Sequence, residues 1–346
     1  MSGFLHIHGH VDQAAVLHRT ALAAARQAAD RAGQAATLRH LGIVHMLTGD
    51  HRSAAASLHQ AMAIFRDIGD RAGQAHSINN LGSVQQRTGN YPAAAASKQQ
   101  ALAIFRDVGD RLGQANALND LGLTRQLTGD YSAAAASYQQ ALALYRDVGH
   151  PFGQADTLSN LGEMQQLTGD YAGAAASQQQ ALTIFGEIGH PFGQAWALNG
   201  LGAVQQQVGD YAAAAASHQQ ALAIFRDLGF RPDQAETLNN LGELSSRTSA
   251  TGRAREHHSA ALKIACDISA PLEEARALEG LGQACLIDGD TGQAATHLRH
   301  ALSIYQRIGA PGAGRVQETL QHHGLTSTQQ HPRQQPGRKD RLTRRA

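Results

Sequence analysis

The sequence predicts an all-α solenoid of antiparallel helix pairs. The dipeptide Leu-Gly recurs every 40 residues in seven successive blocks, from Leu41-Gly42 to Leu281-Gly282. Blocks 121–160 and 161–200 are identical at 24 of 40 aligned positions. A period of roughly 20–50 residues held over many copies indicates a solenoid or a propeller. No segment alternates apolar and polar residues with the period of two that propeller strands need, so the blocks indicate helices.

The first helix of a block is illustrated by residues 71–88. Its apolar residues recur at helical spacing, and they are Ala75, Ile78, Leu81, Gly82 and Val84. Asp30, Asp70 and Asp110 precede this helix in their blocks, where an N-capping side chain is favoured. Pro151 and Pro191 occupy the first helical position in two other blocks, where proline is tolerated. Two independent signals therefore mark the same boundary.

The second helix of the same block is predicted over residues 92–108. The turn before it contains Gly89, and its apolar stripe is Ala94, Ala101, Leu102, Ile104 and Phe105. Arg106 suits the negative end of the helix dipole in the last turn. Gly109 follows as a left-handed cap.

The composition favours many thin helix contacts over one large core. Apolar residues make up 42% of the 346 residues, but aromatic residues make up only 5% and much of the rest is alanine. The net charge is +1. The last sixteen residues carry six basic residues and Asp340, or +5, which leaves 1 − 5 = −4 for the remainder. A slightly acidic body argues against a nucleic-acid groove, which needs a basic stripe.

Each block carries a signature that resembles the tetratricopeptide repeat family. In one block the signature reads Leu118, Leu121-Gly122, Gly129-Asp130-Tyr131, Ala134, Tyr138 and Ala141. The resemblance covers roughly residues 9–310. The 40-residue period and the Asn-Asn-Leu-Gly segments at 79–82 and 239–242 are similar to the repeats of kinesin light chain. They are even more similar to the repeat regions of bacterial STAND-type signalling ATPases and pathway regulators.

The resemblance implies a right-handed superhelix in which the first helices line a concave face. We expect a partial N-terminal repeat over residues 1–30 that contains only a second helix, and seven full repeats over 31–310. A short capping helix over 311–324 and a disordered basic tail over 325–346 should follow. The partial repeat would leave an apolar strip open to an upstream domain or partner. In one block the Gly-Asp-Tyr turn is replaced by Ser249-Ala250-Thr251-Gly252, which predicts a local irregularity.

Two positions on the first helix are candidates for binding a peptide in the concave groove. One is nearly constant and holds Asn79, Asn119, Asn199 and Asn239, with Ser159 interrupting. Asparagine can both donate to and accept from a peptide backbone. The other varies and holds His76, Asn116, Asp156, Trp196, Glu236 and Arg276. The alternatives are that the asparagines form an inherited, solvated helix face and that Trp196 packs on a neighbouring helix.

These features predict a cytoplasmic protein-interaction scaffold in bacterial signalling or regulation. The alternative is a sensor fragment of a larger STAND-type or peptide-responsive transcriptional regulator; a helical-repeat RNA binder is disfavoured. The expected partner is a protein or an extended peptide, with no membrane and no nucleic acid bound by the body. No catalytic motif occurs, so we expect no enzyme activity and no cofactor. His6, His8 and His10 lack the accompanying ligands of a metal site, and Cys266 and Cys285 have no metal spacing.

Overall fold

The structure is a computed structural model that describes residues 11–325. Within these residues it contains helices and no strand, which confirms the all-α prediction. The helices form two compact units, divided between Leu228 and Gly229. The expectations for the histidines at positions 6, 8 and 10, and for the tail after Leu325, lie outside the described residues.

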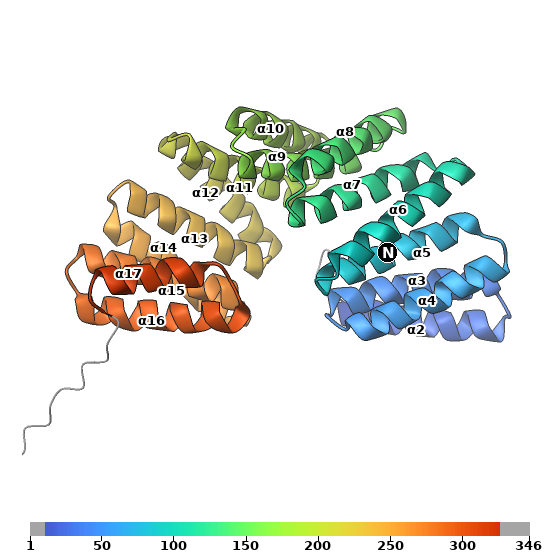
Figure 1. Ribbon diagram of the computed structural model, residues 1–346, viewed down its shortest axis with the longest axis horizontal. Helices are drawn as coiled ribbons and strands as arrows, with labels where there is room; N and C mark the ends of the chain where they lie inside the picture. Colours follow the sequence, from blue (N-terminus) through green and yellow to red (C-terminus); the bar gives the residue numbers. More distant parts are fainter. Residues whose placement is uncertain (1–10, 326–346) are drawn as a thin grey trace, which may run out of the picture. The chain divides into compact units, whose positions relative to one another are not determined.

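Unit 1 contains the helices α2 to α12 (Figure 1). They are α2 (Val11–Gln27), α3 (Arg31–Leu47), α4 (His51–Asp67), α5 (Arg71–Arg87), α6 (Tyr91–Val108), α7 (Arg111–Leu127), α8 (Tyr131–Asp147), α9 (Pro151–Leu167), α10 (Tyr171–Glu187), α11 (Pro191–Gln207) and α12 (Tyr211–Leu228). Unit 2 contains α13 to α17. They are α13 (Arg231–Arg247), α14 (Thr251–Asp267), α15 (Pro271–Ile287), α16 (Thr291–Ile308) and α17 (Gly312–His322).

The helix ends follow the chemistry of the turn residues. The Asp70 carboxylate accepts a hydrogen bond from the Gly73 amide at 2.8 Å, as an N-cap does. Gly109 ends α6 with a φ of 73°, the left-handed conformation that glycine adopts without strain. His150 replaces the capping aspartate in one repeat, and its Nδ1 accepts from the Gly153 amide at 3.0 Å. An unprotonated imidazole nitrogen therefore serves the same capping role.

The turn at residues 249–252 keeps the regular path of the repeat, so the expected irregularity is wrong. Ser249 takes the place of the turn glycine with a φ of 57°. The following helix still begins at Thr251, in register with the other second helices. What is lost is the side-chain cap, since Ala250 cannot supply one. A left-handed non-glycine residue costs about 1–2 kcal/mol, which the packing of the flanking helices outweighs.

In four repeats of unit 1, an aromatic ring at the end of the second helix packs on a glycine at the start of the next first helix. Phe105 is 0% exposed. A Cβ added to Gly113 would lie only 2.4 Å from the Phe105 ring. The same contact joins Phe65 to Gly73, Tyr145 to Gly153 and Phe185 to Gly193. The third residue of these first helices is therefore glycine because the ring of the preceding helix occupies the space of a side chain.

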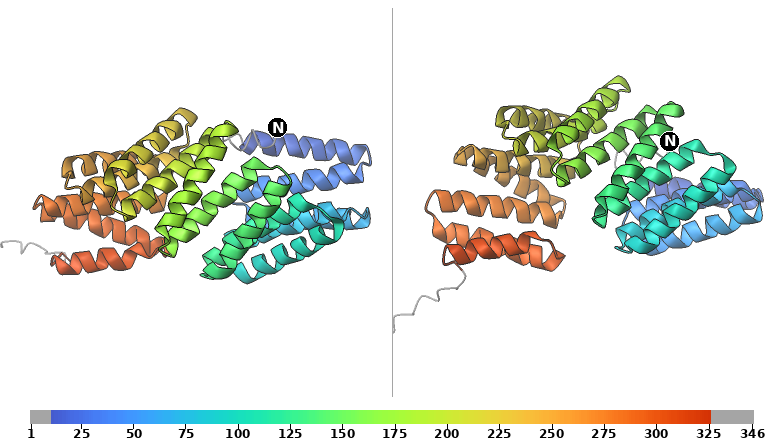
Figure 2. Two further views of the ribbon diagram at one scale, coloured as in Figure 1. Left: turned by 90° about the horizontal axis from the view of Figure 1, so that it is seen from above. Right: turned by 45° about the horizontal axis from the view of Figure 1, so that its top comes forward.

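The first helices of a unit lie together in one layer. In unit 1, α3 contacts α5, α5 contacts α7, α7 contacts α9, and α9 contacts α11. In unit 2, α13 contacts α15 in the same way. The second helices pack on the outside of these rows, as two further directions of view show (Figure 2). Side chains on the free side of the first helices therefore share one surface within each unit.

Candidate peptide-binding groove

Two of the candidate asparagines lie between consecutive first helices of unit 1. Asn79 is 6% exposed and donates to the Asp120 carboxylate at 2.6 Å. Asn119 is 8% exposed and donates to the Asp156 carboxylate at 3.1 Å. The expectation that this position faces freely into the groove is wrong, because the next first helix covers it.

The other two asparagines are also engaged. Asn199 Oδ1 lies 2.8 Å from Nδ1 of His218. Asn239 is 0% exposed, and its amide nitrogen donates to the carboxylate and the backbone carbonyl of Glu273. Its Oδ1 lies 3.1 Å from Nδ1 of His258. The asparagines thus pair within and between the repeats.

A pocket of about 420 Å³ opens on the first-helix layer of unit 1. Its lining comes from α3, α5, α7 and α9, with Tyr145 at the end of α8. Five of the ten candidate residues line it, namely His76, Asn79, Asn116, Asn119 and Asp156. The remaining five, Trp196, Asn199, Glu236, Asn239 and Arg276, lie elsewhere.

The pocket contains two neighbouring carboxylates, Asp120 and Asp156, which both come from first helices. Burial raises the pKa of Asp120 above its usual value. Burial and the charge of Asp120 together raise the pKa of Asp156 to about 6. In each carboxylate Oδ2 accepts from an asparagine, and among the described residues no side chain or amide donates to Oδ1. Two partly desolvated anionic oxygens are therefore available to a ligand.

Two polar atoms of the pocket wall are buried without a hydrogen-bond partner. They are Oδ1 of Asn79, which is an acceptor, and Nδ2 of Asn80, which is a donor. A buried polar group without a partner is costly, so such groups are rare. Together they offer the acceptor and the donor that one peptide group requires.

Aromatic side chains form another part of the wall. Tyr145 donates its hydroxyl to Asn116 at 2.6 Å and stacks on His150, with ring centroids 5.5 Å apart. Phe152 is 43% exposed. Burial lowers the pKa of His76, so its imidazole is neutral near pH 7. The pocket thus combines two acids, unpaired amide atoms and exposed aromatic surface.

The tetratricopeptide repeat family model matches residues 71–147, 153–227 and 193–267, which together span more than half of the chain. The chain belongs to the tetratricopeptide repeat family. No curated protein matches the sequence. The repeats of this family form non-catalytic scaffolds, and membership of the family supports a protein-interaction scaffold.

Solved structures of other tetratricopeptide repeat proteins share the fold. BtubC (BKLC) from P. vanneervenii is 20% identical with a TM-score of 0.56, covering 63% of this chain and 92% of its own. A STAND protein with a tetratricopeptide repeat sensor, PH0952 from Pyrococcus horikoshii, is 16% identical with a TM-score of 0.67 and matches over 83% of this chain. This chain spans 44% of its length. The Rap conjugation gene regulator of plasmid pLS20, in complex with the Phr* peptide, is 13% identical with a TM-score of 0.62. The match covers 88% of this chain and 80% of the regulator's chain.

Trp196 lies on the first helix α11 and does not line the unit 1 pocket. It is 45% exposed, and its indole nitrogen donates to the Glu163 carboxylate at 3.0 Å. Its ring also meets Phe192 edge to face. Glu236 is exposed in unit 2. Trp196 therefore combines features of both sequence interpretations, since it is exposed and also packs on neighbours.

Sequence reasoning missed Asp120 and Lys98. Lys98 is 1% exposed, and its ammonium donates to the Asp120 backbone carbonyl at 3.0 Å and to Thr124 at 2.8 Å, as well as to Gln86. Burial lowers its pKa. The signal for Asp120 was the change from Asn-Asn-Leu-Gly to Asn-Asp-Leu-Gly in one repeat. Lys98 stands at the second-helix position where other repeats carry Leu58, Tyr138 or Leu298.

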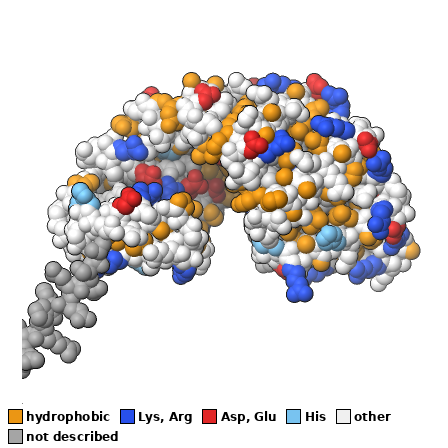
Figure 3. Space-filling view, viewed as in Figure 1, with side chains coloured by type: hydrophobic (Ala, Val, Ile, Leu, Met, Phe, Trp, Pro, Cys, Tyr) orange, Lys and Arg blue, Asp and Glu red, His pale blue; other side chains and the backbone are white. Residues whose placement is uncertain are grey.

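The surface outside the pocket shows no gathering of one charge on the face drawn in Figure 3, where basic and acidic side chains of the described residues are interspersed. Within the described residues, no cluster of side chains is arranged to hold a metal ion. None of the described helices is long and apolar enough to cross a membrane.

Proposed function

We propose that the chain is an interaction scaffold in bacterial signalling or regulation, and that the unit 1 pocket binds an extended peptide segment carrying a cationic side chain. The observation that carries the proposal is the pair of half-buried carboxylates, Asp120 and Asp156, in one pocket. A lysine or arginine placed between their Oδ1 atoms would offset the cost of holding two partly desolvated charges near each other.

The charges around the pair favour a cation. Lys98 lies beneath Asp120 and balances one negative charge. The carboxylate of Glu163 adds another negative charge near Asp156 and helps to raise its pKa. Arg39 also lines the pocket, but it contacts His40 instead of either aspartate. The net balance of these five charged side chains is 2 − 3 = −1.

The remaining wall suits the rest of a peptide. Asn79 Oδ1 and Asn80 Nδ2 are placed to accept from and donate to one backbone amide group. The predicted role of the asparagines in binding a peptide backbone is thus kept in altered form. One atom of Asn79 and one atom of Asn80 take the place of the asparagine that recurs at the same position of several first helices. The exposed Phe152 and the Tyr145 ring can cover the aliphatic stem of the basic side chain or stack on its charge.

The fold neighbours support this class of partner. The Rap regulator of pLS20 was solved with the Phr* peptide, and another Rap protein was solved with Competence and Sporulation Factor. A sensor portion of a larger STAND-type regulator is the second candidate. It is favoured by the likeness to PH0952, whose tetratricopeptide repeats are a sensor within a longer protein.

A random peptide library displayed on phage tests the proposal when it is selected on the full chain near pH 7.5. We expect enrichment of peptides with lysine or arginine. The double variant Asp120→Asn/Asp156→Asn should lose that enrichment, because the neutral amides keep the shape of the pocket and remove its charge. Asp227→Asn removes an exposed carboxylate outside the pocket and serves as the control. Enrichment of acidic peptides, or no enrichment on the native chain, would contradict the proposal.

A further inference from the structure

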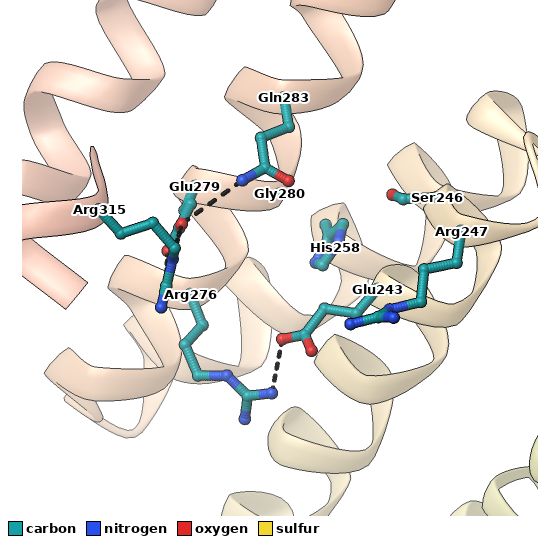
Figure 4. A pocket seen from close by; sticks show the side chains of 9 residues that line it. All are labelled: Glu243, Ser246, Arg247, His258, Arg276, Glu279, Gly280, Gln283 and Arg315. Carbon is teal, nitrogen blue, oxygen red and sulfur yellow. Dashed lines mark hydrogen bonds and ion pairs between the residues drawn. The ribbon is translucent and has the colours of Figure 1, made fainter. Parts of the chain in front are cut away.

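A second pocket, of about 480 Å³, lies wholly within unit 2 and has a different lining. Its side chains come from α13, α14, α15 and α17 (Figure 4). The volume is within the range of small-molecule sites. Of the candidate residues named from the sequence, Arg276 alone lines it, and it shares no lining residue with the unit 1 pocket.

His258 forms part of this lining and has one nitrogen without a partner. Asn239 donates to Glu273, which fixes the orientation of its amide group and leaves Oδ1 facing Nδ1 of His258. Nδ1 must therefore carry the proton, and Nε2 is an acceptor. Nε2 is buried without a hydrogen-bond partner, and the whole side chain is 1% exposed. Burial lowers the pKa of His258 to about 4, so the ring is neutral near pH 7.

The tip of the His258 ring occupies the space that a side chain at Gly280 would take. A Cβ at position 280 would lie 2.2 Å from Nε2 of His258. The equivalent position in five other repeats carries a polar side chain, namely His40, Asn80, Asp120, Asn160 or Asn240. Gly200 is the other exception, and it lies over Gln178, whose buried Oε1 also lacks a partner. Glycine at this position thus accompanies an unsatisfied buried acceptor twice in the chain.

The charged lining has both signs, and one cation is unpaired. Arg276 pairs with Glu243 at 2.7 Å, and Arg315 makes two hydrogen bonds to the buried carboxylate of Glu279. Among the described residues, Arg247 has no ion-pair partner, and it is exposed at the edge of the pocket. Figure 4 shows Glu243 and Arg247 extending from the same helix, with His258 on the next. A carboxylate could therefore pair with Arg247 without displacing an existing contact.

We propose that the unit 2 pocket binds a small amino-acid-type ligand, with an ammonium group and a carboxylate on one carbon. The ammonium group donates to Nε2 of His258 beside the Glu243 carboxylate, which also pairs with Arg276, and the ligand carboxylate pairs with Arg247. A simple anion satisfies Arg247 but offers no donor to His258. A simple amine leaves Arg247 unpaired. The combination of a neutral acceptor, an acid and a free guanidinium therefore selects a ligand with both charges.

The test is a titration of the full chain with each common L-amino acid, with propionate, propylamine and inorganic phosphate as reference probes. Binding is measured by calorimetry and by the imidazole nitrogen resonances of His258, which are assigned by their loss in His258→Leu. We expect at least one amino acid to bind saturably and to shift the Nε2 resonance. The three reference probes should bind at least about tenfold more weakly, since each lacks one charged contact.

Substitutions distinguish a ligand-binding role of His258 from a purely structural role. Leucine already occupies the equivalent second-helix position at Leu58 and Leu298, so His258→Leu should fold. We expect His258→Leu and Arg247→Gln each to lose about tenfold or more in affinity, and Asp227→Asn, an exposed position outside both pockets, to lose none. The proposal is overturned if no amino acid binds, if phosphate or propionate binds as tightly as the best amino acid, or if His258→Leu keeps its affinity.

Discussion

Replacing Phe105 by alanine is expected to lower the free energy of unfolding by about 3–5 kcal/mol, the usual cost of removing a buried aromatic ring. Phe105 is fully buried in a cluster that includes Ile78, Leu102 and Leu118 from neighbouring helices. The ring also fills the space above Gly113, so its loss opens a cavity between two repeats. Denaturant unfolding followed by circular dichroism measures the change.

The matched control is Phe152→Ala, two repeats further along the chain. Phe152 is 43% exposed, so its removal should change the free energy of unfolding by only about 0.5 kcal/mol. An equal loss in the two variants would show that the ring at the end of α6 does not hold the repeats together.

Lys98→Ala is expected to destabilise the chain by a similar amount, about 3–5 kcal/mol, because one partner of a buried polar network is removed. Its loss removes one donor from each of the Asp120 carbonyl, Thr124 and Gln86. It also removes the positive charge that lowers the pKa of Asp120. Denaturant unfolding again measures the change.

Lys98→Leu separates packing from polar contacts. Leucine restores the apolar volume that Leu58 provides at the same position in another repeat, so the loss should fall to about 1–3 kcal/mol. If Lys98→Ala costs less than about 1 kcal/mol, the ammonium group does not stabilise the interface of these repeats.

The sequence predicts the helices well because each repeat fixes its own boundaries. The aspartate caps, the first-turn prolines and the turn glycines lie within each block, and α5 and α6 begin and end within one residue of the ranges expected. The turn at Ser249 was misjudged because the packing of α13 and α14 outweighs the cost of a left-handed serine.

The candidate site was predicted only in part because it depends on contacts between repeats. Helical periodicity separates the face of a first helix that packs on its own partner from the opposite face. It does not reveal that the next first helix covers Asn79 and Asn119 and leaves His76 half-buried at the pocket. Asp120 and Asp156 are 36 residues apart in sequence, and only the stacking of α7 on α9 brings their carboxylates into one pocket.

The ion pairs between helix ends illustrate the same limit. Asp67, Asp107 and Asp147 lie at or near the end of the second helix in their repeats. Each aspartate pairs with an arginine at the start of the first helix of its own repeat. These arginines are Arg31, Arg71 and Arg111, respectively. Both partners are about half exposed, so each pair contributes little to stability. Their regular spacing of 36 residues reflects the geometry of a helix pair and gives no indication of a binding site.

The assignment of the unit 1 pocket to a cationic peptide segment is tested most directly by measuring the affinity of one selected basic peptide at about pH 7.5 and about pH 5. Above its pKa of about 6 the Asp156 carboxylate is charged and attracts the cation, and below it the carboxylate is protonated and the attraction is lost. We predict that the native chain binds roughly tenfold more weakly at the lower pH, about 1.4 kcal/mol. Asp156→Asn should bind weakly at both values and change less, which separates Asp156 from the pocket histidines. An affinity of the native chain that is the same at both values, or equally tight binding by Asp156→Asn, would contradict the assignment.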